Sequence, residues 1–322
     1  MKFKQLLLLI TSVTSLGMIL SNNKIINSNQ NTTFLNKNNV SKISFNKMTG
    51  TTGEINSLTF NGEQTYAVNN KGIVYKSDNG QSFEEINLLN YDYKIKSLIT
   101  TPNGTIYVGT YNEKNNELKV YILKNDQLAE KYTLSSHQLL AMTFDKENNI
   151  YIGTNEGVYT NSSPTTELEK IDGATGNITV LKTTKNGLIY AGNTEGMIFK
   201  SIGGNPFNLV EQLEDGGITS IAVDNKETVF VTNNSKKVYY KRVTIANFLP
   251  YKQTLETINT TVITFGTGVL VGDKDGNIWK SYKENNFNLM NENKLNSINE
   301  LIYNSNNFTI YATTTDGIYK NK

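Results

Sequence analysis

Cysteine is absent from the 322-residue chain, and arginine and histidine each occur once, as Arg242 and His137. Without cysteine the protein has no disulfide, no thiol-linked lipid and no thiolate nucleophile. A single histidine excludes two-histidine metal sites and a proton relay between histidines. We interpret His137 as a solvated loop residue rather than a general base, because the sequence offers it no visible partner.

An excess of charge of one sign is also lacking, since 31 basic residues face 29 acidic ones and the net charge is +2. Nucleic-acid binding usually needs a clustered basic surface, so we expect no nucleic-acid partner. No phosphate-cradling glycine loop is present either. We therefore expect neither a cofactor nor a bound metal.

The N-terminus differs in composition from the rest of the chain. Two lysines precede an apolar run from Leu6 to Leu20, which is short for a membrane span and suits a signal-peptide core. We predict a signal peptide at 1–21, with an uncleaved anchor as the alternative, and a disordered linker at 22–39. The expected location is secreted or cell surface, with membrane contact only through the N-terminal segment if it is uncleaved.

A phrase such as IYVGT recurs along the remainder of the chain. Its aligned residues are spaced by 41, 44, 39, 40, 40 and 41 positions: Tyr66, Tyr107, Tyr151, Tyr190, Phe230, Leu270 and Tyr311. A second phrase precedes the first in each copy with nearly the same period; it begins at Ile55, Ile95, Leu139, Ile178, Ile218, Ile258 and Ile298. Two anchors with one period indicate a seven-copy repeat.

Each copy contains short runs of β-branched and aromatic residues separated by Asn-Gly, Asp-Gly or Glu-Gly pairs. This pattern predicts strands joined by tight hairpin turns. Four antiparallel strands, A to D from the axis outwards, in about 40 residues are typical of a propeller blade. The predicted fold of 40–322 is therefore all-β, a seven-bladed β-propeller of four-stranded blades.

The last copy ends at GIYKNK, just after its strand C, which would leave an exposed sheet edge. The segment VSKISFNKM, residues 40–48, contains FNKM, which echoes the strand D phrases FNLV at Phe207 and FNLM at Phe287. We therefore predict that this N-terminal strand completes the seventh blade and closes the ring.

The turn after strand C of the first blade carries Asp78, Gly80 and Phe83 at the spacing of an Asp-box, with Ser77 beside the place of the usual serine. The chain from 40 to 322 thus resembles the Asp-box (BNR) or WD40/YVTN-like propeller superfamily, and also the propeller repeats of two-component regulators. The resemblance implies the fold, whereas this fold carries many functions. Sialidases, which share Asp-boxes, resemble one another in clamping a carboxylate with three arginines. Because Arg242 is the one arginine of this chain, we do not expect sialidase activity.

One candidate site lies at the propeller axis. The third residue of strand A is small or medium-sized in six copies and is Glu300 in the seventh. Lys96 and three asparagines, Asn56, Asn259 and Asn299, stand one position earlier and could share its channel mouth. The alternative is a water-filled channel with solvated polar walls, which we favour over a ligand site.

A second candidate site lies in the loops from strand D to strand A, which contain Tyr91, Tyr93 and Tyr251. Tyrosines beside asparagines on one rim are common in binding surfaces. On the same face, GDKDGN at 272–277 resembles the start of a calcium loop but lacks its closing glutamate. Because the other copies read as plain glycine turns here, we interpret it as a turn.

The sequence favours an exported, non-enzymatic propeller that binds an unknown extracellular protein or glycan through its D-to-A and B-to-C loops. A carboxylate-based glycosidase or lyase at the axis is one alternative. A sensing or scaffolding module anchored in the membrane by its N-terminus is the other.

Overall fold

The computed structural model describes residues 42–88, 93–161, 163, 165–253, 255, 258–265, 268–282, 286–304 and 307–321. The predicted signal peptide and linker lie outside these residues. Within the described ranges all regular structure is strand, and no helix there could cross a membrane.

The described residues form seven four-stranded antiparallel sheets. Blades one to three comprise β2 (Ile55–Asn61), β3 (Gln64–Asn69), β4 (Val74–Ser77), β5 (Glu84–Ile86); β6 (Lys94–Thr100), β7 (Ile106–Asn112), β8 (Glu117–Lys124), β9 (Gln127–Ser135); β10 (Leu139–Phe144), β11 (Ile150–Thr154), β12 (Gly157–Thr160) and β13 (Glu169–Ile171). Blades four and five comprise β14 (Ile178–Thr183), β15 (Leu188–Asn193), β16 (Met197–Ile202), β17 (Asn208–Gln212); β18 (Ile218–Val223), β19 (Val229–Asn233), β20 (Val238–Lys241) and β21 (Leu249–Pro250). Blades six and seven comprise β22 (Ile258–Phe265), β23 (Gly268–Asp273), β24 (Ile278–Tyr282), β25 (Asn288–Leu289); β26 (Ile298–Asn304), β27 (Thr309–Thr314), β28 (Gly317–Asn321) and β1 (Phe45–Lys47).

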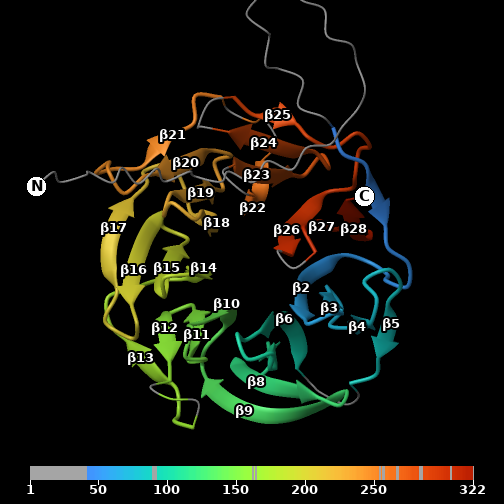
Figure 1. Cartoon of the computed structure of the whole chain (residues 1–322). Coiled ribbons are helices and arrows are strands. Elements are labelled where there is room, and N and C mark those ends of the chain that lie inside the picture. The colour runs from blue at the N-terminus through green and yellow to red at the C-terminus, as the bar shows by residue number, and fades with distance from the viewer. Residues whose placement is uncertain are drawn as a thin grey trace, which may run out of the picture. The chain divides into compact units, whose positions relative to one another are not determined.

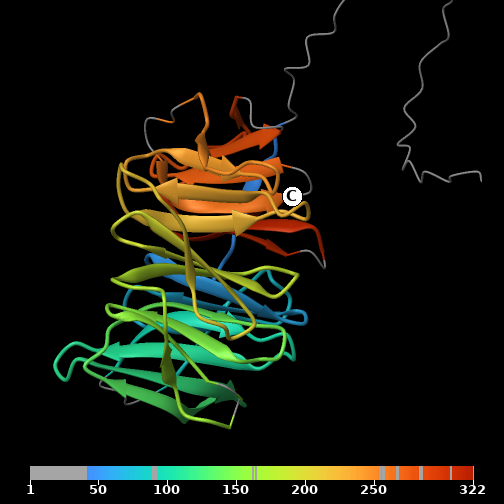
Figure 2. The same ribbon diagram turned by 90° about the vertical axis from the view of Figure 1, so that its left-hand side faces the viewer.

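The sheets stand around a common axis, with strand A of each blade innermost (Figure 1). Neighbouring inner strands contact one another around the whole ring, and β26 of blade seven meets β2 of blade one. Seen from the side, the blades stack as successive twisted sheets (Figure 2). The predicted seven-bladed propeller is confirmed.

Ring closure by the N-terminal strand is also confirmed. Strand β1 pairs antiparallel with β28 and is the outer strand of blade seven, where the blue and dark red ends of the ribbon meet (Figure 1). Ile43 forms a bridge with Asn291 of blade six, and the backbone N–H of Phe83 in blade one donates to the carbonyl of Thr49 at 2.9 Å. Residues 43–49 therefore hold three consecutive blades together.

The core lies between the sheets. Each strand B has a neighbouring sheet on both faces, so β11, β19 and β23 are buried along their whole length. A strand buried on both faces reads as an unbroken apolar run, which explains the recurring phrase. Its glycine is also explained, because a Cβ at Gly192 would lie 2.5 Å from the Cγ2 atom of Ile218 in the next blade.

The turn predicted as an Asp-box is organised by a different residue. The side-chain oxygen of Asn79 accepts the backbone N–H of Gln81 at 2.8 Å, whereas Asp78 accepts a hydrogen bond from Gln64. Ser77 and Phe83 are buried, and Gly80 has φ +60°. The hairpin is thus capped next to the matching aspartate, because Asn79 faces the loop amides and Asp78 faces the adjoining turn.

Candidate functional site

On one face of the ring, a buried asparagine at the end of strand B joins two turns within the same blade. The Asn193 side-chain oxygen accepts the N–H groups of Glu195 and Met197, at 3.0 and 2.9 Å, and its amide donates to the Thr175 carbonyl at 2.9 Å. The first two residues belong to the B–C turn and the third to the D–A loop. Asn69 and Asn233 make the same connections in blades one and five.

In blade six the equivalent position is Asp273, the first aspartate of the segment that resembles a calcium loop. Its Oδ1 atom accepts the N–H groups of Asp275 and Asn277, at 2.9 and 2.8 Å. Its Oδ2 atom accepts hydrogen bonds from the Asn277 amide and from the Trp279 indole N–H, at 2.9 and 2.7 Å. Both carboxylate oxygens thus hold the turn, as the interpretation of this segment as a turn requires.

The two predicted rim tyrosines that the structure describes, Tyr93 and Tyr251, do not lie on one surface. Tyr91 lies outside the described residues. Tyr93 is half-buried and donates a hydrogen bond to Glu117, with the Lys119 ammonium 5.2 Å from its ring centroid. Tyr251 is 5% exposed and packs on Phe287 with ring centroids 4.7 Å apart, so the structure places it in the core between blades five and six.

His137 is half-buried rather than solvated. Its Nδ1 atom lies 2.7 Å from the Ser135 carbonyl oxygen, and its Nε2 atom lies 2.6 Å from the Tyr159 hydroxyl. A carbonyl can only accept, so Nδ1 carries the proton and Nε2 accepts from the tyrosine. Glu156 lies 3.4 Å from Nε2. The ring therefore connects the end of β9 in blade two with the B–C turn and β12 of blade three.

The predicted polar residues beside the axis share a structural cause. Asn56, Lys96 and Asn299 each occupy the position where strand A bulges against strand B. A bulge leaves one residue outside the ladder and redirects its side chain. Asn299 donates to the Ile55 carbonyl of blade one at 3.2 Å, and Lys96 reaches Glu113 in the B–C turn of blade two at 3.9 Å. Asn259 lies within the bulge of β22, and its side chain is outside the described residues.

Glu300 faces a different region from those residues. It follows the bulge in β26 and lines a cavity of about 430 Å³ in the axial channel. The ends of β14 and β18 and the A–B turns that follow them form most of this cavity, so it opens at the opposite mouth from the D–A loops. Its described lining residues are Lys182, Thr183, Thr184, Lys185, Asn186, Ala222, Val223, Asp224, Asn225, Glu227, Glu300, Leu301, Ile302 and Tyr303. None of the bulge residues Asn56, Lys96 and Asn299 is among them.

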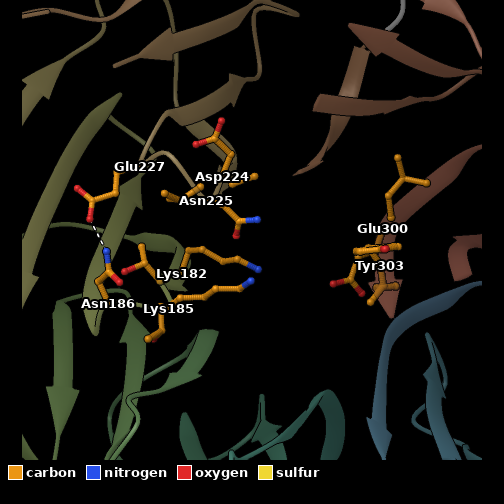
Figure 3. Close-up of a pocket in the computed structure, with 14 residues that line it drawn as sticks. Lys182, Lys185, Asn186, Asp224, Asn225, Glu227, Glu300 and Tyr303 are labelled. Atoms are coloured by element: carbon orange, nitrogen blue, oxygen red, sulfur yellow. Dashed lines mark hydrogen bonds between the residues drawn. The ribbon is translucent and has the colours of Figure 1, made fainter. Parts of the chain in front are cut away.

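Lys182 and Lys185 extend from blade four towards Glu300 across the cavity (Figure 3). Protein surrounds these groups on all sides of the channel, although Lys182 is exposed to the lumen and Glu300 is half-buried. Desolvation raises the pKa of Glu300 to about 7, against the opposing attraction of Lys182 and a hydrogen bond from the Leu58 backbone N–H. Desolvation also lowers the pKa of Lys182, against the attraction of Glu300.

The two lysines were missed by the sequence reasoning. Lys182 is the fifth residue of its strand A, where blades one, three and five have Thr59, Thr143 and Ala222. A lone lysine in an innermost strand is the same kind of signal as Glu300, and scanning every strand A position would have found it. Among the described residues no group of three His, Cys, Asp or Glu side chains is placed to hold a metal ion.

No protein-family model and no curated protein matches this chain. Several solved structures resemble it. The extracellular domain of a putative one-component system from B. thetaiotaomicron superposes with a TM-score of 0.70 at 17% identity, covering 86% of this chain and 40% of that chain. Virginiamycin B lyase from Staphylococcus aureus gives 0.71 at 10% identity, covering 87% and 98%. The WD40 β-propeller domain of Doa1 gives 0.68 at 12% identity, covering 87% and 95%.

At these identities the likeness shows the fold. The expected resemblance to WD40-like propellers and to the extracellular propellers of regulator systems is confirmed at that level. The chain spans 40% of the putative one-component-system structure, so that protein is longer than the propeller shared with it.

Proposed function

We propose that the protein is an exported, non-enzymatic β-propeller that binds an extracellular protein or glycan through its D-to-A and B-to-C loops. The observation that supports this function is the buried asparagine that joins both loops of one blade, as Asn193 does in blade four. Loops held in this way are already ordered before a partner arrives. Binding then loses little conformational entropy, which is the main benefit of a preorganised surface.

The tips of the B–C turns give this face charges of both signs. Lys71, Glu156, Glu195, Lys236 and Lys274 are exposed there, one in each of five blades. Exposed charges of both signs on a rigid frame favour selective recognition and faster encounter with a complementary surface. Extracellular function is supported by the likeness to the extracellular domain of a putative one-component system.

A capture experiment with matched surface variants tests this function. The immobilised full chain is exposed to extracellular material, and retained proteins and glycans are identified by mass spectrometry. Reversing two charges on the loop face, Lys236→Glu and Lys274→Glu, should abolish specific capture. Reversing two exposed lysines on A–B turns, Lys146→Glu and Lys226→Glu, should leave it intact. Equal loss in both pairs, or loss in neither, would exclude the loop face as the binding surface.

A second candidate function is carboxylate-based glycosidase or lyase activity at the axis. It is favoured by Glu300, which lines a cavity and whose pKa is raised to about 7, the range that suits a general acid at neutral pH. Glu300→Gln should abolish turnover if this activity exists, while capture of a partner by the loop face would continue. A variant that retains full turnover would eliminate the carboxylate mechanism.

Membrane-anchored sensing or scaffolding is a third candidate, favoured by the same extracellular-domain likeness. It predicts that full-length protein with an intact N-terminus is recovered in the membrane fraction. Recovery of only a shortened chain in the medium would instead support export with cleavage.

A further inference from the structure

The axial cavity contains two lysines from blade four. Lys182 and Lys185 are exposed to the cavity, and both side chains extend towards its centre (Figure 3). Among the described residues, no carboxylate oxygen lies within the 4.0 Å of an ion pair from either nitrogen. Two like charges in one partly enclosed space repel one another, and an anion that enters this space reduces the repulsion.

The acidic residues nearest these lysines are engaged elsewhere. The Asp224 Oδ1 atom accepts the backbone N–H groups of Lys226 and Thr228, both at 2.8 Å, and so closes its own A–B turn. Glu227 accepts a hydrogen bond from the side-chain amide of Asn186 (Figure 3). The remaining acid is Glu300, on the opposite wall. The two lysines and Glu300 therefore lie on opposite sides of the cavity. The negative charges of Asp224 and Glu227 are stabilised by hydrogen bonds from the protein.

The rest of the lining is suited to a hydroxyl-bearing ligand. Thr183, Thr184, Asn225 and Tyr303 provide hydroxyl or amide groups around the cavity. A volume of about 430 Å³ is within the range of small-molecule sites, which is about 300–1,000 Å³. A ligand with hydroxyl groups can form hydrogen bonds with this polar lining, whereas an apolar ligand cannot.

From this arrangement we propose that the axial cavity binds a small hydroxylated carboxylate, such as a sugar acid. The carboxylate lies between Lys182 and Lys185, and the hydroxyl groups extend towards Glu300 and Tyr303. A neutral sugar would leave the two ammonium groups uncompensated. Hydrogen phosphate has a single hydroxyl group to offer the far wall, and its double negative charge would be repelled more strongly than a carboxylate by the three acidic side chains.

This site is independent of the proposed loop-face function. It lies at the mouth formed by the A–B turns, and it shares no residue with the B–C turn tips. Loss of small-acid binding and loss of partner capture would therefore come from different variants.

Isothermal titration of the full chain with gluconate, glucose and inorganic phosphate tests the proposal. Gluconate should bind, whereas glucose, its neutral counterpart, and phosphate should bind at least tenfold more weakly. Lys182→Met and Lys185→Met should each weaken gluconate binding by about tenfold or more, the usual effect of losing one charge-assisted hydrogen bond. Lys226→Met is the matched control, because Lys226 is exposed on the neighbouring turn and does not line the cavity.

Three outcomes would overturn the proposal. They are no measurable gluconate binding, phosphate binding as tight as gluconate binding, and a loss in Lys226→Met as large as in Lys182→Met. Unchanged thermal unfolding of the lysine variants would show that the cavity remains folded, which is expected because both side chains are exposed.

Discussion

The two faces of the propeller hold their turns in different ways. On the face of the D–A and B–C turns, one buried side chain such as Asn193 connects two turns that are separated along the chain. On the face of the A–B turns, the turns of blades two to five are each closed by their own first residue. Asp145 accepts the N–H groups of Glu147 and Asn149, and the Thr184 hydroxyl accepts the N–H of Leu188.

As a result, the face of the D–A and B–C turns is a rigid surface, and the face of the A–B turns contains a charged channel mouth. Joining two turns makes the loops of one blade move together, which favours recognition of a large partner without ordering cost. Because the A–B turns are closed locally, side chains of strand A line the channel mouth. Lys182 and Glu300 face one another there. Large-partner binding and small-ligand binding are therefore assigned to opposite faces.

Both faces depend on the closed ring, so the largest expected effect comes from opening it. Deleting residues 42–48 removes β1 together with the buried side chains of Phe45 and Met48. Truncating a buried Phe or Met typically costs about 2–5 kcal/mol each. In addition, β28 loses its backbone hydrogen bonds with β1. We expect a loss of about 5 kcal/mol or more in the free energy of unfolding, and a fall of about 10 °C in the unfolding midpoint.

The control for this deletion removes seven residues of the predicted linker, 26–32. Its unfolding midpoint, followed by circular dichroism, should match that of the full chain. If the two deletions gave the same melting curve, closure by β1 would contribute nothing to stability. Partner capture and gluconate binding should both be lost with 42–48, because blades six, seven and one are no longer held together.

A glycine pair sharpens the contrast between the faces. Gly173, in the D–A loop of blade four, has φ +94°, and a Cβ there would lie 1.8 Å from the Phe207 carbonyl oxygen. Gly62, in the A–B turn of blade one, has φ +63° and no atom within 4 Å of the Cβ position. Gly62→Ala should cost only the strain of a left-handed residue, about 1 kcal/mol, whereas Gly173→Ala should cost about 3 kcal/mol or more.

Urea unfolding of the two alanine variants measures this difference directly. The backbone hydrogen bond from Phe207 to Asp172, 2.8 Å long, must also be disturbed in Gly173→Ala, since the added methyl group meets the Phe207 backbone. Equal losses in the two variants would mean that backbone conformation alone, and not close approach within the loop face, determines the cost.

The fold could be predicted from the sequence because each blade places the same packing requirements on its residues. A strand B with a sheet on both faces must be apolar throughout, and Gly192 must have no side chain where Ile218 approaches. Requirements of this kind recur in every copy and appear as a period in the sequence. The closing strand was found for a related reason, since a blade without an outer strand leaves an unpaired edge.

The candidate sites were harder to predict because they depend on geometry across blades. Lys182 and Glu300 face the same cavity because the blades are arranged in a ring. The residue spacing within one copy of the repeat does not reveal this. Tyr251 was expected at the rim because its place in the repeat falls in a loop from strand D to strand A. The backbone N–H of Tyr251 in fact donates to the Val238 carbonyl at 2.9 Å, so backbone pairing continues past β21. This pairing directs the tyrosine side chain into the core.

The smallest expected effect concerns the charge on Glu300. Its pKa is about 7 in the folded protein and about 4.5 in the unfolded chain, so between these values the folded state binds more protons. The contribution of Glu300 to stability therefore falls as pH rises from about 4.5 to 7. Glu300→Gln lacks this loss, and its stability relative to the original protein should rise by about 1–2 kcal/mol across the window. This is less than the full shift implies, because the side chain keeps contact with channel water.

Urea unfolding at pH 5 and pH 7.5 measures the change. Glu63→Gln, which removes an exposed carboxyl on the A–B turn of blade one, is the matched surface variant for this measurement. Because the positive charge of Lys182 opposes the rise in the Glu300 pKa, Lys182→Met should extend the window to higher pH. Parallel stability curves for the original protein and Glu300→Gln would show that channel water solvates this carboxylate fully. Glu300 would then not distinguish the channel mouth from the loop face.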